Sequence, residues 1–364
     1  MTVDLLFEWL NGLFANLSGN AFFLIIAILV PCLALFGFIT VYAFVVIYME
    51  LKVSSFIQDK VGPMGQGVGL HAGKWGILQP IADALKLLTK EDIIPESADK
   101  PLFIMAPFMI FIGAFIGFIA LPFGEYIIIT DLNIGIFYIL AVGSFSVIAL
   151  ILAGWASNNK WSLYGGMRSA AQIVSYEIPA GLSIVVVIML SSTLSMQGII
   201  KYQEGGIFNW IIFTNPFAFV AFFIYFISAM AETNRTPFDI PEAESELVGG
   251  FHTEYSGMRF AFFFLSEYAN MFVVSGVAVT GFLGGWQSPI PGYFNTPLWG
   301  IFWMLSKTMF LVFMMIWMRW TFPRLRVDQL MNVCWKVLLP ISLVNIFGVG
   351  IWTLVFGYKY GKIL

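Results

Sequence analysis

Apolar residues are gathered into long runs that charged residues interrupt mainly at their ends. A helix that crosses a bilayer needs about 20 consecutive, mostly apolar residues. Eight runs have this length, at roughly 21–49, 102–122, 134–154, 173–195, 211–231, 258–283, 297–318 and 336–357. The pattern predicts an all-α, polytopic membrane protein with eight transmembrane helices, organised as one integral-membrane domain over residues 1–364.

Basic residues are distributed unevenly between the connections. The first connection holds Lys52, Lys60, Lys74, Lys86, Lys90 and Lys100, and the other odd connections hold Lys160, Arg168, Arg235, Arg259, Arg319, Arg324 and Arg326. The second and sixth connections hold no lysine or arginine, and the fourth holds only Lys201. Because cytoplasmic connections carry the excess of basic residues, the odd connections are predicted to face the cytoplasm and both termini to face outside.

The first connection also contains a short amphipathic pattern. After Pro80, which suits the first turn of a helix, Ile81, Leu85 and Leu88 share one helical face and Lys86 lies on another. The pattern fits either an ordinary cytoplasmic helix resting on the bilayer or an interfacial helix that frames an opening from the lipid. We predict the interfacial helix and keep the first interpretation open.

Composition excludes a soluble enzyme and gives no sign of a bound cofactor. Charged residues make up 11% of the chain, against about 25% in soluble domains, and the mean hydropathy is +0.87. The glycine-rich run Gly62–Gly76 lacks the spacing of a phosphate-binding loop, and Cys32 and Cys334 are far apart. We therefore expect no metal, flavin or iron–sulfur centre on this chain.

Carboxylates are concentrated in one short segment. Between 229 and 255 lie Glu232, Asp239, Glu242, Glu244, Glu246 and Glu254, with only Arg235 and His252 to offset them. Pro237 and Pro241 disfavour helix before them, so an extended stretch followed by a helix start near Pro241 is predicted. Carboxylates near a helix N-terminus are stabilised by about 0.3–1 kcal/mol each, which accounts for part of this acidity.

Other acids fall in or beside the apolar runs. Glu177 lies in the fourth run, Glu267 in the sixth, and Glu232 at the end of the fifth. A charged group at the bilayer centre costs about 2.5–3.5 kcal/mol, so such residues are functional candidates. They are either neutral, hydrogen-bonded links between helices or a proton-carrying chain. Glu50, two residues before Lys52, fits a surface pair or the mouth of a cavity.

Several motifs resemble one family of membrane proteins. The segment Ala231–Ser256, AETNRTPFDIPEAESELVGGFHTEYS, is similar to the signature of the H subunits of proton-pumping NADH:quinone oxidoreductase, or respiratory complex I. The motifs GILQPIADA (76–84), GWASNNK (154–160) and RLRVDQL (324–330) agree with this family as well. The likeness runs in order from about residue 40 to residue 350.

The resemblance implies a membrane subunit at the junction of two arms of a larger complex, in a bacterial inner membrane. Such subunits form most of a quinone chamber, while neighbouring subunits hold the quinone headgroup and the terminal iron–sulfur cluster. Membrane lipid is a further partner, and nucleic acid is not. The implied coupling residues are Glu177, Glu232, Arg235, Glu244, Glu246, Glu254 and Glu267. The implied chamber residues are Glu50, Lys52, Lys60, Asp83, Lys86, Phe238 and Asp239.

Two other functions compete with this one. A membrane anchor of a hydrogenase or ferredoxin-linked ion-pumping complex would share the fold without serving quinone, and gene neighbours encoding a nickel-binding subunit would favour it. A free-standing ion or solute transporter would be active without partners. The acidic segment suits docking to partner subunits better than solute transport.

Overall fold

The structure is a computed structural model that describes residues 21–60, 62–63, 75–241, 244–290 and 296–356, with their side chains apart from those of 21–28 and 244–245. Within these ranges all regular structure is helical. Seven helices in the described part of the chain are long and apolar enough to cross a membrane: Leu29–Ile57, Lys100–Ala120, Gly135–Ala156, Lys160–Ser191, Gly257–Phe282, Pro297–Thr321 and Val327–Phe356. The prediction of an all-α, polytopic protein is confirmed to this extent.

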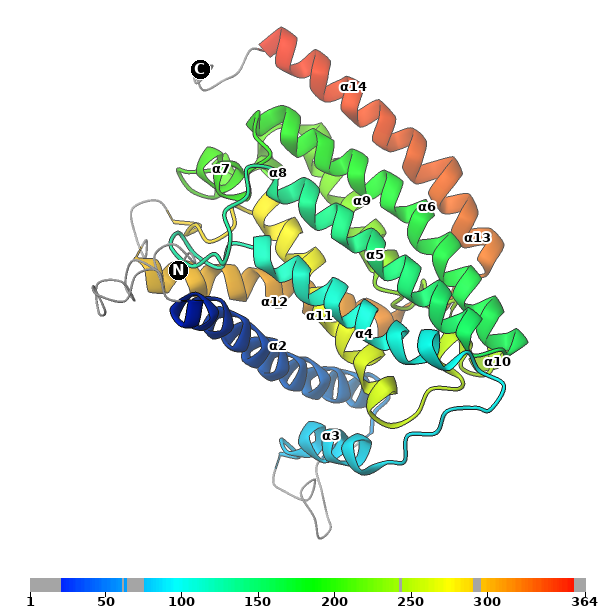
Figure 1. Cartoon of the computed structure of the whole chain (residues 1–364). Coiled ribbons are helices and arrows are strands. Elements are labelled where there is room, and N and C mark those ends of the chain that lie inside the picture. The colour runs from blue at the N-terminus through cyan, green and yellow to red at the C-terminus, as the bar shows by residue number, and fades with distance from the viewer. Residues whose placement is uncertain (1–20, 61, 64–74, 242–243, 291–295, 357–364) are drawn as a thin grey trace.

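The long helices pack side by side, and α11 contacts α2, α4, α9 and α12 (Figure 1). They are α2 (Ala21–Ile57), α4 (Lys100–Gly117), α5 (Gly135–Ala156), α6 (Lys160–Ser191), α9 (Pro216–Glu232), α11 (Gly257–Phe282), α12 (Pro297–Thr321) and α14 (Leu339–Phe356). The short helices are α3 (Gln79–Thr89), α7 (Met196–Tyr202), α8 (Ile211–Thr214), α10 (Glu244–Leu247) and α13 (Val327–Asn332). A π-helical segment, Val333–Leu338, joins α13 to α14. Helices α4, α5, α6 and α14 form one flank, and α2 and α12 lie on the other side of α11.

Two helices differ from the predicted spans. The fourth span, predicted from 173, begins at Lys160, where the Asn159 side chain accepts a hydrogen bond from the Trp161 backbone N–H at 2.9 Å. Hydropathy misses this start because the first turns of α6 are polar. The fifth predicted span, 211–231, is divided between α8 and the 17-residue α9, because Asn215 caps α9 and Pro216 occupies its first turn. An eighth crossing therefore stays a prediction.

Short helices mark the two ends of the bundle. Figure 1 places α3 and α10 at one end and α7 and α8 at the other. The first and fifth connections thus lie on the same side, as the charge pattern predicts. Which side faces the cytoplasm is still a prediction.

The α3 end is attached to the start of α11. The Ser256 hydroxyl donates to the Glu91 carbonyl oxygen at 3.1 Å, and Arg259 Nη2 lies 3.0 Å from Asp92 Oδ2. Apolar side chains of α3, among them Leu85 and Leu88, are exposed. The interfacial role of α3 stays a prediction that this exposed apolar surface supports.

At the opposite end, Lys307 of α12 holds the turn that follows α11. Its Nζ lies 2.8, 3.0 and 2.8 Å from the carbonyl oxygens of Leu283, Gly285 and Gln287. The same ammonium group lies 4.0 Å from the ring centroid of Trp210. One half-buried cation therefore joins α12, the end of α11 and the start of α8.

Candidate functional site: a buried ionic network beside an acidic cavity

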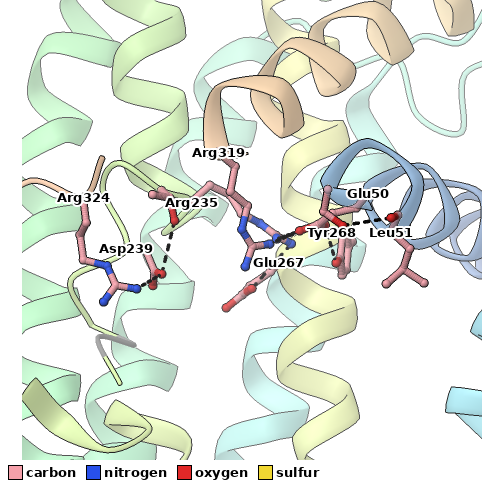
Figure 2. A network of polar contacts seen from close by, with 10 residues as sticks. Glu50, Leu51, Arg235, Asp239, Glu267, Tyr268, Arg319 and Arg324 are labelled. Atoms are coloured by element: carbon pink, nitrogen blue, oxygen red, sulfur yellow. Dashed lines mark hydrogen bonds and ion pairs between the residues drawn. The ribbon is translucent and has the colours of Figure 1, made fainter. Parts of the chain in front are cut away.

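Arg235 lies at the centre of a buried network just after the end of α9 (Figure 2). The residue is 3% exposed, and its Nη1 lies 3.4 Å from both carboxylate oxygens of Glu50 on α2. Its Nη2 lies 3.9 Å from Oε2 of Glu267 on α11. The guanidinium also stacks 4.4 Å from the ring centroid of Tyr268. Residues far apart in the sequence thus meet at one cation.

Glu50 has two further partners in this network. Arg319, in the last turn of α12, forms an ion pair with it, and the Tyr268 hydroxyl donates to its Oε2 at 2.7 Å. Glu50 is 6% exposed and lies inside α2, which continues to Ile57. The interpretation of Glu50 and Lys52 as a surface pair is therefore wrong, because arginines from two other segments surround Glu50.

The network is balanced in charge, with two arginines and two glutamates. Burial alone lowers the pKa of the Arg235 guanidinium, but the Glu50 carboxylate acts in the opposite direction. Tyr268 and Glu267 add to the effect of Glu50, so the pKa of Arg235 is raised and the side chain stays charged. Removing one member of such a buried set leaves an uncompensated charge.

The chain after Arg235 turns where an extended stretch was predicted. The Phe238 N–H donates to the Arg235 carbonyl oxygen at 2.8 Å, and the Thr236–Pro237 peptide bond is cis. Local sequence rules predict only that residues before proline avoid helix, and a turn satisfies them equally well. The predicted helix start is seen as α10, which begins at Glu244, while residues 242–243 lie outside the described ranges.

Asp239 is held in a second ion pair next to the turn. Its Oδ2 lies 2.9 Å from Nη2 of Arg324 and accepts a 3.4 Å hydrogen bond from the Thr236 hydroxyl. The Leu325 N–H donates to the Pro237 carbonyl oxygen at 3.1 Å. The segment before α13 therefore packs directly on the turn (Figure 2).

Gln172 of α6 holds the turn from the other side. Its Nε2 donates to the carbonyl oxygens of Ala231 and Phe238 at 2.8 and 2.6 Å, and to Asn234 Oδ1 at 3.2 Å. Gln172 is buried, as is Asn234, whose φ of 51° is left-handed. The position of Arg235 thus depends on an amide in the middle of α6.

Replacing Gln172 with leucine is expected to lower the free energy of unfolding by about 1–3 kcal/mol, because the buried Phe238 carbonyl loses its hydrogen bond. Thermal unfolding of the purified protein measures the effect. Gln58→Leu, at an exposed position just beyond α2, serves as the control and should leave the midpoint unchanged. Equal midpoints for the two variants would show that the Gln172 amide does not hold the turn.

Glu232, in the last position of α9, lines two small cavities. The first, here called the Glu267 cavity, is also lined by Glu267, Ser146, Asn234 and Asn270. The second, here called the Gly143 cavity, is also lined by Gly143 and Asn270. The carboxylate of Glu232 interacts electrostatically with that of Glu177, to which Ser144 donates a short hydrogen bond. Glu232 therefore shares a cavity wall with Glu267 and lies within electrostatic reach of Glu177.

Of the remaining predicted coupling acids, Glu246 is exposed and Glu254 is half-buried. Glu246 forms a 2.6 Å ion pair with Arg168 of α6, and the Asn159 Nδ2 donates to Glu254 Oε1 at 2.6 Å. The side chain of Glu244 lies outside what the structure describes. The acidic segment thus separates into a buried end at Glu232 and a peripheral end attached to the start of α6.

The predicted chamber residues are not brought together as one group. Lys60 is exposed, Lys52 lies 5.6 Å from the Tyr48 ring centroid, and Asp83 and Lys86 form a 3.4 Å surface pair on α3. Phe238 and Asp239 are in the turn against α6, and Phe238 packs edge-on against Tyr176. Glu50 is the member of the predicted chamber set that forms an ion pair with Arg235.

Sequence reasoning missed the network partners Arg319 and Tyr268, as well as Gln172 and Asn270. In the sequence, Arg319 contributes only to the charge pattern that predicts the orientation of the spans. The other three are ordinary polar residues within helices. The periodicity of α11 offers one signal, since Asn270 falls three residues after Glu267 and so shares its face. Over the described residues, no cluster of three or more His, Cys, Asp or Glu side chains could hold a metal.

The sequence matches known proteins over most of its length. A family model described as NADH dehydrogenase matches residues 30–350. A protein of Chlorobaculum tepidum is 53% identical over 328 residues, which cover 87% of this chain and 90% of the relative. A protein of Anaeromyxobacter dehalogenans is 46% identical over 352 residues, covering 92% and 84% of the two chains. One of Bacteroides thetaiotaomicron is 44% identical over 346 residues, covering 93% and 94%. All three relatives are named as the H subunit of an NADH-quinone oxidoreductase.

Proposed function

Because the chain belongs to the NADH dehydrogenase family, we propose that it is the membrane subunit of an NADH-quinone oxidoreductase that guides quinone and couples its reduction to proton movement. The complex lies in a bacterial inner membrane, and neighbouring subunits supply the electrons and grip the quinone headgroup. The chain itself carries out no redox chemistry. Its two tasks are to line the path of the quinone and to pass on the electrostatic effect of quinone reduction.

The quinone path runs between α2, α3 and the start of α11. Support comes from the exposed apolar side chains of α3, next to the charged Asp83 and Lys86 on the same helix. An apolar tail and a polar headgroup together need this mixture of surfaces. Lys52 and Lys60, at and beyond the end of α2, lie at the same end of the bundle.

Coupling passes through the Arg235 network to the buried carboxylates. Glu50 and Glu267 both pair with Arg235, and Glu267 lines a cavity together with Glu232. A change of charge near Glu50 alters the field at Arg235 and hence at Glu267, because these pairs are buried and weakly screened. Glu232 then interacts with Glu177 on α6. The peripheral acids Glu246 and Glu254 fasten the acidic segment to α6.

The observation that carries this proposal is that Glu232 and Glu267 line the same cavity. Glu232→Gln keeps the shape of the side chain and removes its proton-carrying group. We expect quinone reductase turnover, coupled to proton translocation in membrane vesicles, to fall at least about tenfold, since proton transfer by a positioned group contributes about 10²–10⁴-fold. Turnover is measured per assembled complex.

Glu204→Gln provides the matched control, because Glu204 is exposed at the opposite end of the bundle, just after α7. The control is expected to keep full turnover. Glu246→Gln should have a smaller effect than Glu232→Gln, since Glu246 is in a surface pair. Full turnover in Glu232→Gln, with the complex assembled, would refute the relay.

A further inference from the structure

The side chains of α11 change from polar to apolar along one face of the helix. Glu267 lines only the Glu267 cavity, whereas Val273, Val274 and Val277 line only the Gly143 cavity. Asn270 lies between them and lines both cavities. These residues share a face because they follow one another at helical spacing. On this face of α11, Asn270 is therefore the polar residue that precedes the apolar valines.

Asn270 shares the wall of one cavity with two carboxylates. Glu267 precedes it by one turn on α11, and Glu232 faces the same cavity from α9. Ser146, Thr233 and Asn234 complete the polar part of this wall. A cavity with several polar groups on its wall can hold water, whereas an apolar one stays dry. The Glu267 cavity thus has the lining that an ordered water requires.

The Asn270 amide has hydrogen-bonding capacity to spare. It is half-buried, and no residue within the described ranges forms a hydrogen bond with its side chain. An amide offers two donors and an acceptor oxygen, so it can orient water from either direction. Being neutral, it neither traps a migrating proton nor repels one. A carboxylate at the same position would trap the proton, and the ammonium group of a lysine would repel it.

We propose that Asn270 is a positioning residue that holds the water connecting Glu267 to Glu232. The inference rests on the proposed relay and assigns to Asn270 the step between its two buried acids. No bond of Asn270 is broken, since the proton passes from one carboxyl to the other through water.

The test compares Asn270→Thr with Asn270→Val. Threonine and valine have the same shape, but only threonine has a hydroxyl that can bind water, so packing effects are common to both. We expect Asn270→Val to have about tenfold lower coupled turnover than Asn270→Thr. This is a fraction of the about 10²–10⁴-fold that a positioned proton-transfer group contributes to rate. We also expect a larger solvent deuterium isotope effect on turnover in the valine variant. Ile139→Leu, at the wall of the Gly143 cavity alone, serves as the packing control.

Two contrary results can be told apart when Glu232→Gln is measured alongside. Equal turnover and equal isotope effects in the threonine and valine variants would overturn the role of Asn270, while a loss in Glu232→Gln would leave the relay standing. Full turnover in Glu232→Gln would overturn the relay itself, and the role of Asn270 with it. If the β-branched pair does not assemble, Asn270→Ser and Asn270→Ala compare the presence of a hydroxyl with its absence.

Discussion

Replacing Arg235 with methionine is expected to destabilise the folded chain by about 3–5 kcal/mol, the usual cost of removing one partner of a buried ion pair. Methionine fills much of the same space, so loss of packing is a minor part of the effect. The larger part arises because Glu50 and Glu267 stay buried with one cation fewer between them. Thermal unfolding of the purified complex, together with the yield of assembled subunit, measures the loss.

A double-mutant cycle separates the charge effect from packing. In Arg235→Met with Glu50→Gln, Arg319 and Glu267 stay and the network is neutral again, so the double variant should be more stable than the sum of the single effects predicts. Residues in one ionic network usually show coupling of about 0.5–3 kcal/mol. Arg168→Met removes a surface pair and should cost about 1 kcal/mol or less. Additive effects in the cycle would contradict the network.

The spans could be predicted from the sequence because apolar length is a property of consecutive residues. The same signal failed at the start of α6, where helical residues are polar, and at Pro216, where one apolar run contains two helices. Helix ends depend on caps such as Asn159 and Asn215, which hydropathy does not register. Local capping chemistry thus accounts for the largest differences between the predicted and observed helices.

The acids of the candidate site were also predictable, because carboxylates are costly in apolar runs and therefore conspicuous. Their partners were not, since Glu50 meets Arg235 and Arg319 only after α2, α9 and α12 have packed. Lys52 was the nearest base in sequence, and it lies instead beside Tyr48. Proximity along the chain is a poor guide to pairing when α-helical packing brings distant residues together.

Lys307 shows that a half-buried cation in this bundle can be structural, and its removal is the second large effect that we expect. Gly284 and Gly285 adopt φ angles of 72° and 54°, which glycine reaches without steric cost, and the turn they make directs three carbonyl oxygens towards Nζ. These carbonyls follow the C-terminus of α11, where the helix dipole favours a positive charge. Hydrogen bonds to a charged group contribute about 1.5–3 kcal/mol each, and water can replace part of this at a half-buried site.

Lys307→Met is therefore expected to lower the free energy of unfolding by about 3 kcal/mol. This equals roughly one full hydrogen bond to a charged group, because water replaces the rest of the interaction at this half-buried site. Lys201→Met, at an exposed position on α7 at the same end, should leave the thermal midpoint of the complex unchanged. Lys307→Arg should fall between the two, because a planar guanidinium keeps the charge but cannot direct three donors as an ammonium does. A midpoint for Lys307→Met equal to that of Lys201→Met would mean that backbone hydrogen bonds hold the turn without the cation.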